Sequence, residues 1–112
     1  MNEVFELLED LPHKFRKKLD GEVSMTEITR YSLQINDKAW VVVTNSKIYV
    51  LKKKLWFITC QKHKLSQVFT SEVENGKFII KTDSDETSLP VNSDRVKHVS
   101  QLADNIQELT KS

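Results

Sequence analysis

The 112-residue chain is 38% hydrophobic and 29% charged with a net charge of +1, a composition typical of one soluble globular domain. It has no apolar run of the roughly 20 residues that cross a bilayer, and its two glycines and two prolines are too few for linkers or phosphate loops. An acidic N-terminus argues against a secretory signal, and the lone Cys60 predicts a buried thiol in a reduced, cytoplasmic setting.

The N-terminal stretch, residues 2–19, predicts an amphipathic helix, because apolar side chains recur at helical spacing and acids precede bases as the helix dipole favours. Pro12 interrupts this pattern, since an interior proline removes a backbone hydrogen bond. One bent helix and two helical pieces that meet at Leu11 and Pro12 both stay open. We assign residues 1–20 to this N-terminal helix and residues 21–112 to the domain that follows it.

The first strands are predicted by runs of β-branched and aromatic residues between polar breakers. Residues 22–35 alternate apolar and polar side chains, with one phase slip at 28–31 that predicts a bulge or a break. Residues 38–61 hold both tryptophans and predict three consecutive strands, the centre of the sheet. Their apolar runs are 39–43, 48–51 and 55–60.

Three more strands and a helix are expected in the second half of the chain. Asn75-Gly76 is the clearest hairpin turn, because both residues tolerate the positive φ of a type I′ turn. Pro90 in the last strand suits the edge of a sheet. A single apolar stripe over residues 96–109 predicts an amphipathic C-terminal helix. The three expected strands begin near residues 65, 77 and 87.

Residues 40–51, WVVVTNSKIYVL, consist of an apolar run, a threonine, a short polar turn and a second apolar run. This hairpin, and the order of seven strands before one helix, resemble the pleckstrin-homology-like (PH-like) superfold. Divergent members with a similar hairpin include bacterial PH-type and GRAM domains, the tail-homology domain of class I myosins, and CARMIL-type PH domains. The resemblance implies a mainly β (α+β) fold, a bent seven-stranded antiparallel barrel or sandwich closed by the C-terminal helix, here with an extra N-terminal helix.

The resemblance implies no head-group-specific pocket at the loop between the first two strands. Phosphoinositide-binding PH domains carry several basic residues around that loop, whereas residues 34–38 contain one lysine and one aspartate. The terminal helix also lacks the tryptophan that typical PH domains have there.

An enzyme is not expected, and neither is a metal or a cofactor. His13, His63 and His98 lie in separate segments, with no Cys, Asp or Glu at metal-ligand spacing. The acids at residues 83–86 fall in a predicted turn, where they are solvated. Walker A, nucleophile-elbow and dinucleotide-binding motifs do not occur in the sequence.

The distribution of charge is more informative than the net charge. Between Asp37 and Glu72 there are seven lysines and no acidic residue. Three consecutive lysines, 52–54, predict a basic turn that shares one rim of the sheet with the turn at residues 36–38. Such a rim attracts anionic lipid by about 1 kcal/mol per lysine, and one of the two residues that follow the triplet is expected to face the core. The candidate lipid- or anion-binding residues are Lys38, Lys52, Lys53, Lys54 and Trp56.

We therefore expect a non-catalytic PH-like adaptor or targeting module that associates weakly and peripherally with anionic membranes. Two other interpretations of the lysine triplet stay open. The triplet either solubilises an exposed turn and protects a sheet edge, or it binds an acidic protein or, last in rank, a nucleic acid.

The alternative function is a protein-interaction module that binds no lipid. A peptide strand would add beside the C-terminal helix, or the stripe of the N-terminal helix would bind a partner helix or a second copy in a homodimer. That helix could instead pack over one end of the barrel. The candidate partner-binding residues are Phe5, Leu8, Leu11 and Phe15.

Overall fold

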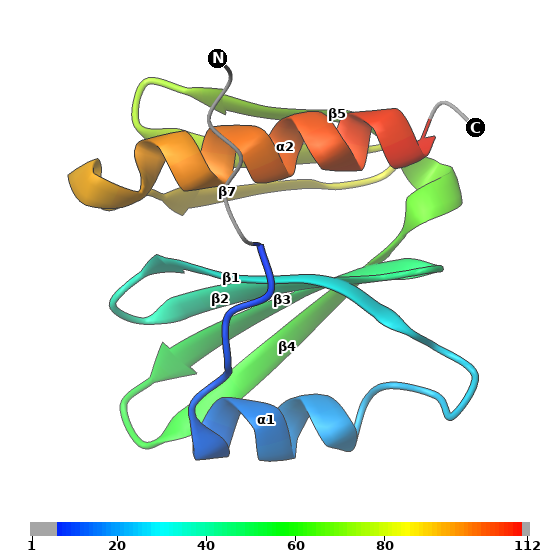
Figure 1. The fold of residues 1–112 in the computed structure, drawn as a ribbon, viewed down its shortest axis with the longest axis vertical. Coiled ribbons are helices and arrows are strands. Elements are labelled where there is room, and N and C mark those ends of the chain that lie inside the picture. The colour runs from blue at the N-terminus through cyan, green and yellow to red at the C-terminus, as the bar shows by residue number, and fades with distance from the viewer. Residues whose placement is uncertain (1–6, 111–112) are drawn as a thin grey trace.

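The computed structural model describes residues 7–110, which form two antiparallel sheets and two helices (Figure 1). The first sheet has the strand order β1 (Thr29–Asn36), β2 (Ala39–Thr44), β3 (Lys47–Lys54) and β4 (Phe57–Lys64). The second has the order β5 (Val68–Glu74), β6 (Lys77–Thr82) and β7 (Glu86–Pro90). The predicted class, mainly β with α and seven strands, is confirmed. Within the described residues the two sheets stay separate and do not close into a barrel.

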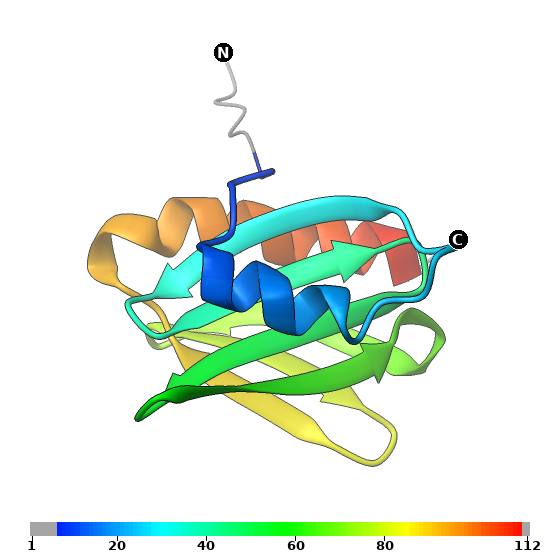
Figure 2. The same cartoon turned by 90° about the horizontal axis from the view of Figure 1, so that it is seen from below.

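The centre of the four-stranded sheet, β2 and the middle of β3, is buried on both faces. Side chains alternate across a strand, so Val41 and Val43 pack toward the second sheet, whereas Trp40 and Val42 pack toward helix α1 (His13–Asp20). Every residue of β2 is therefore buried, which explains its nearly continuous apolar run. Figure 2 shows α1 lying over one face of this sheet.

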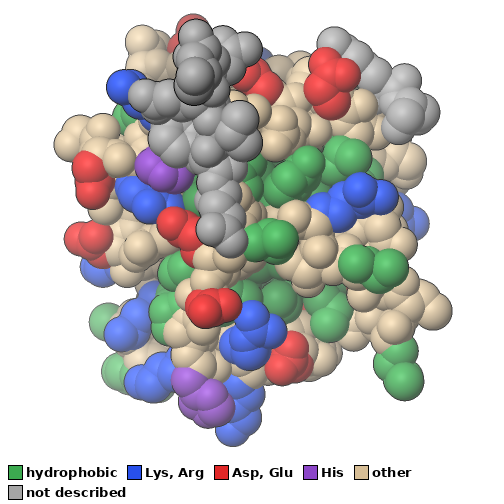
Figure 3. Space-filling view, viewed as in Figure 1, with side chains coloured by type: hydrophobic (Ala, Val, Ile, Leu, Met, Phe, Trp, Pro, Cys, Tyr) green, Lys and Arg blue, Asp and Glu red, His purple; other side chains and the backbone are tan. Residues whose placement is uncertain are grey.

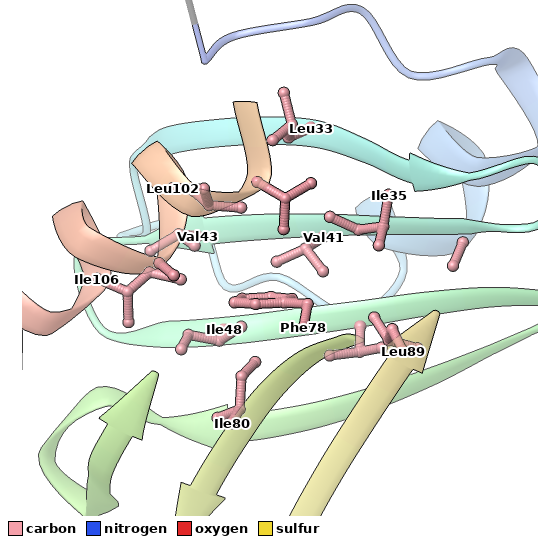
Figure 4. Packing of buried hydrophobic residues seen from close by; sticks show 14 of the residues in the cluster. Leu33, Ile35, Val41, Val43, Ile48, Phe78, Ile80, Leu89, Leu102 and Ile106 are labelled. Carbon is pink, nitrogen blue, oxygen red and sulfur yellow. The ribbon is translucent and has the colours of Figure 1, made fainter. Parts of the chain in front are cut away.

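The C-terminal helix, α2 (Val96–Thr110), follows a short 3₁₀ turn at Ser93–Arg95 and confirms the predicted apolar stripe. It packs against β5 and β1, and its buried residues close the larger core. Figure 4 shows Leu102 and Ile106 directed into the same interior as Phe78. The stripe consists of Val99, Leu102, Ala103 and Ile106. No helix in residues 7–110 is long and apolar enough to cross a membrane.

The prediction of a helix that starts near residue 2 is wrong for residues 7–12. The helix begins at His13, immediately after Pro12, whose carbonyl oxygen accepts the first helical hydrogen bond, from Arg16 N–H at 3.0 Å. Proline has no N–H and fixes its own φ. A helix can therefore begin directly after Pro12, but it does not continue through this residue. Of the two helical pieces considered, the second forms. Residues 1–6 lie outside the described part of the chain.

The segment before α1 is extended because it pairs with β1. Ser32 N–H donates to the Leu7 carbonyl at 2.7 Å, and Glu9 N–H donates to the Ser32 carbonyl at 2.8 Å. The Glu9 carboxylate accepts a hydrogen bond from Gln34 N–H at 3.0 Å and forms an ion pair with Arg95. Burial opposes the charge on Glu9, but these two partners outweigh it and lower its pKa. The segment is thus held by both the sheet and the 3₁₀ turn that precedes α2.

Two local predictions about turns and bulges are confirmed. The pairing of β1 with β2 slips between Thr29 and Tyr31, where the alternation of the sequence changes phase, although β1 begins at Thr29 and not at residue 22. Asn75 and Gly76 have φ of 53° and 73°, as a type I′ turn requires.

Candidate functional site

Two turns of the four-stranded sheet meet at one rim, as the sequence predicts. The backbone N–H of Lys53 donates to the carbonyl of Lys38 at 2.7 Å, and Lys52 lies opposite Ala39 in the β2–β3 pair. The four lysines of this rim line an open hollow of about 250 Å³ between the first sheet and β7. The residues around it are Asn36, Lys38, Ala39, Lys52, Lys53, Lys54, Ser88, Leu89 and Pro90. We call Lys38 and Lys52–Lys54 the basic rim.

The lysine triplet is not the turn itself, which corrects the sequence prediction. Lys52, Lys53 and Lys54 are the last three residues of β3, and Lys54 pairs with Phe57 across the hairpin. The turn consists of Leu55 and Trp56 alone. A two-residue loop is the commonest connection in a hairpin, and it forms here because the strand pairing continues through the lysines to the end of β3.

The tip of this hairpin exposes large apolar side chains. Leu55 is 77% exposed, Trp56 81% and Phe57 48%. The expectation that Leu55 or Trp56 faces the core is therefore wrong, because both point into solvent. Trp40, by contrast, is buried and lies 6.3 Å from the ring of Phe15. We call Leu55, Trp56 and Phe57 the apolar tip.

A second hollow lies on the other side of the same hairpin, between α1 and β4. Its volume is about 360 Å³, and it is lined by Lys14, Lys17, Lys18, Trp56 and Ile58. The sequence reasoning missed these three lysines because it explained them only by the helix dipole. Their spacing of i, i+3 and i+4 places them on one side of a helix, but nothing in that spacing indicates that β4 and Trp56 lie beside them.

The charges of the basic rim are not neutralised by nearby carboxylates. Ion pairs among the described residues involve Lys18, Lys62, Lys81 and Arg95, so no carboxylate of residues 7–110 lies within 4.0 Å of a basic-rim ammonium. The nearest acid in sequence, Asp37, accepts a hydrogen bond from the side chain of Asn92 at 3.0 Å.

Lys62, which lies outside the basic rim, forms an ion pair with Glu22, with 2.8 Å between Nζ and Oε2. Its hydrogen bond lowers the pKa of Glu22, and the same bond raises the pKa of Lys62. Lys18 lies 3.7 Å from the other oxygen of this carboxylate. Of the seven lysines in the acid-free window, Lys62 is therefore held in an ion pair, while the basic rim keeps four positive charges available.

The candidate partner-binding stripe of the N-terminal helix is largely covered. Leu11 and Phe15 are buried, 8% and 6% exposed, in a cluster with Trp40 and other residues on the outer face of the sheet. Leu8 is 54% exposed, and it lies before α1 in the extended segment. Phe5 lies outside the described residues. The structure therefore leaves only Leu8 of the three described residues on the surface.

The outer edge of β5, beside α2, is also occupied. The side-chain oxygen of Gln107 accepts a hydrogen bond from Ser71 N–H at 3.0 Å, and its amide nitrogen donates to the Phe69 carbonyl at 3.4 Å. The Ser71 hydroxyl donates to the Ala103 carbonyl at 3.1 Å. Ser71 N–H and the Phe69 carbonyl are backbone groups of β5 that an added peptide strand would pair with. In this conformation α2 already satisfies them.

The other reactive side chains lie apart from the basic rim. Burial lowers the pKa of His63, whose Nε2 shares a hydrogen bond with the hydroxyl of Thr87 at 2.8 Å. Burial raises the pKa of the Cys60 thiol, which reduces its thiolate fraction at neutral pH. Within residues 7–110 no three His, Cys, Asp or Glu side chains gather into a metal site. What the rim offers is ammonium groups beside apolar surface.

Comparison with known proteins gives no match, neither to a protein-family model nor to a curated protein. The functional interpretation therefore rests on the geometry of the basic rim and the apolar tip.

Proposed function

We propose that this protein is a non-catalytic targeting module with a PH-like fold that associates weakly with anionic membrane surfaces through the basic rim and the apolar tip. The observation that carries the proposal is the juxtaposition of the two: the exposed side chains of Leu55 and Trp56 directly follow three lysines that form no ion pair with a carboxylate of residues 7–110. The PH-like fold is supported by the order of four strands, three strands and a closing C-terminal helix.

The apolar tip is poorly suited to water and well suited to a bilayer interface. Each large apolar side chain gains about 1.5–3 kcal/mol when it leaves water, and tryptophan is enriched at the level of the lipid headgroups. Monomeric proteins seldom expose several adjacent large apolar residues without a binding role. Insertion of Leu55 and Trp56 between headgroups would bury them without changing the fold.

The basic rim supplies the electrostatic part of the interaction. Each lysine near an anionic surface contributes about 1 kcal/mol, and this attraction falls off within a Debye length. Four lysines therefore provide a few kcal/mol that salt weakens. Figure 3 shows basic (Lys or Arg) and hydrophobic side chains side by side at the lower left, where the β3–β4 turn lies in Figure 1. A membrane would meet both kinds of side chain together.

The hollow at the basic rim favours weak binding without headgroup specificity. It is open and lined by flexible lysines, with Asn36 and Ser88 as its other polar side chains. Arginine forks, which recognise phosphate with fixed geometry, are absent from its lining. We therefore infer recognition of negative charge rather than of one lipid.

The alternative, a protein-interaction module, has less support. Strand addition beside α2 would have to displace Gln107 from the β5 edge, and a partner for the α1 stripe would have to expose Leu11 and Phe15. Self-association through the apolar tip is the form of this alternative that needs no rearrangement.

Vesicle sedimentation tests the membrane proposal. The wild-type protein should sediment with phosphatidylserine vesicles at low salt, less at high salt, and not with phosphatidylcholine vesicles. The triple variant Lys52→Glu, Lys53→Glu, Lys54→Glu should lose this binding. A control variant reverses Lys47 and Lys64, which lie opposite each other at the other end of the same β3–β4 pair, and should retain most of it. Absence of wild-type binding at every salt concentration would sink the proposal.

Tryptophan fluorescence separates membrane insertion from self-association. Brominated lipids should quench the wild-type emission, and Trp56→Phe should abolish that quenching, because the remaining Trp40 is buried. A mass that rises with protein concentration in light scattering, and falls in Trp56→Ser, would instead favour a homodimer formed through the apolar tip.

A further inference from the structure

The hollow between α1 and β4 is separate from the one at the basic rim. Buried Phe15 and Leu19 fix α1 on the outer face of the sheet. Helical periodicity then places Lys14, Lys17 and Lys18 on the side of α1 that faces β4. The β3–β4 hairpin thus stands between two hollows, each bordered by lysines.

The chemistry of this second hollow is amphipathic. Trp56 and Ile58 supply apolar surface, and three ammonium groups come from the helix. The ammonium of Lys18 lies 3.7 Å from the Glu22 carboxylate. No carboxylate of residues 7–110 lies within 4.0 Å of the ammonium of Lys14 or Lys17. An occupant that complements the hollow therefore carries negative charge for the lysines and an apolar part for Trp56.

We propose that this hollow receives the phosphate and glycerol of an anionic phospholipid, so that α1 is part of the membrane-contacting surface. The inference rests on the proposed function, because it assigns a second contact with the same membrane. A free phosphate ion satisfies only the lysines and leaves Trp56 and Ile58 exposed. A lipid satisfies both groups, and its acyl chains continue toward the apolar tip, to which Trp56 also belongs.

The second contact also defines an orientation on the membrane. Contact through the basic rim alone leaves the domain free to tilt about the hairpin. Contact through α1 as well brings the Lys14–Lys17 side of the helix to the surface together with Leu55 and Trp56. The opposite ends of β4 and β6, which carry Lys64 and Thr82, then point away from the bilayer.

Two neighbouring residues of α1 provide a matched test. Lys17 lines the hollow and Arg16 does not, yet both are exposed and both lie in the same helix. Lys17→Glu should lower partitioning onto phosphatidylserine vesicles by roughly 25-fold, since each charge near the surface contributes about fivefold and the substitution changes two. Arg16→Glu should also lower partitioning, but the loss should be several-fold smaller than for Lys17→Glu. Lys14→Glu should behave like Lys17→Glu.

The outcomes separate the inference from the function on which it rests. If the wild-type protein binds no anionic vesicle, the proposed function fails. If it binds but Lys17→Glu and Arg16→Glu weaken binding equally, only the role of α1 is overturned. Circular dichroism checks folding, and Lys17→Gln, which removes one charge without reversing it, should show about a fivefold loss.

A final arm distinguishes lipid from other anions. The indole N–H resonance of Trp56 should shift on addition of a short-chain phosphatidylserine and stay unchanged with inorganic phosphate at the same concentration. A shift that saturates with inorganic phosphate alone, or with an acidic peptide and not with the lipid, would overturn phospholipid as the occupant.

Discussion

Leu55 and Asn75 adopt the same left-handed backbone conformation, with φ of 54° and 53°, each at the first position of a two-residue turn. Asparagine enters this conformation readily, whereas for leucine it costs about 1–2 kcal/mol. Strain of this kind at an exposed position indicates a role other than stability. The proposed membrane contact would account for a leucine at the β3–β4 turn, because neither its left-handed backbone nor its exposed side chain stabilises the fold.

The two turns give a paired prediction. Leu55→Asn should raise the free energy of unfolding by roughly 0.5–1 kcal/mol, because it relieves the left-handed leucine, while it weakens vesicle binding. Asn75→Leu should lower the free energy of unfolding by about 1 kcal/mol. Urea denaturation and vesicle sedimentation measure the two effects. A less stable Leu55→Asn variant would contradict the assignment of strain to this position.

Phe15 tests whether α1 is a fixed part of the fold. It is 6% exposed and packs against Trp40, so Phe15→Ala should lower the free energy of unfolding by about 3–5 kcal/mol. Arg16→Ala, on the exposed side of the same helix, should change it by less than about 0.5 kcal/mol. A small effect of Phe15→Ala in urea denaturation would mean that α1 is loosely attached and that its stripe is open to partners.

Glu27 anchors the loop before β1. Its carboxylate accepts hydrogen bonds from Ser24 N–H at 2.7 Å, from the Tyr49 hydroxyl at 2.7 Å, and from the hydroxyls of Thr44 and Ser46 at 2.8 and 3.1 Å. Burial opposes its ionisation, but these donors outweigh burial and lower the pKa of Glu27 to about 2. The charged carboxylate is therefore the form that the fold stabilises.

The acid dependence of stability follows from that pKa. The contribution of Glu27 is present above its ordinary pKa of 4.5 and is lost as the pH falls from 4.5 toward about 2, because the unfolded chain takes up the proton first. Glu27→Gln should lower the free energy of unfolding at neutral pH by about 1–3 kcal/mol. The difference from the wild type should shrink in acid. A constant difference across a pH series of urea titrations would refute this account.

His63 predicts a second, separate pH effect. Burial lowers its pKa below the ordinary 6.5, so below pH 6.5 the unfolded chain binds a proton that the folded chain does not, and stability falls. His63→Phe should reduce this dependence below pH 6.5. Thr87→Val leaves Nε2 of His63 without the hydroxyl at 2.8 Å and should cost about 1–3 kcal/mol at neutral pH. Thermal melts over this range measure both.

Gln107 predicts how firmly α2 closes the β5 edge. Gln107→Ala removes two hydrogen bonds to backbone groups of β5 and should lower the free energy of unfolding by roughly 1–2 kcal/mol. Gln101→Ala, which removes only a contact with Asn105 within the helix, should cost less than about 0.5 kcal/mol. Equal effects of the two variants would show that the β5 edge does not depend on Gln107.

Local patterns determined much of this fold in advance. The apolar run of β2, the alternation in β6, the Asn75-Gly76 turn and the apolar stripe of α2 each depend on neighbouring residues, because strand and helix patterns are properties of short segments. The shared rim of Lys38 and Lys53 could also be predicted, since alternate turns of a meander lie at the same end. These features identified the class of fold and one half of the candidate site, the basic rim.

Only the tertiary structure decided the rest, because the decisive contacts join residues far apart in the chain. Residues 7–11 match a helical pattern, yet backbone pairing with Ser32 and the Glu9–Arg95 ion pair, 86 positions apart, hold them extended. The strand register left both Leu55 and Trp56 outside the core. The packing of α1 on the outer face of the sheet brought its lysines to Trp56, and no local period in the sequence encodes that contact.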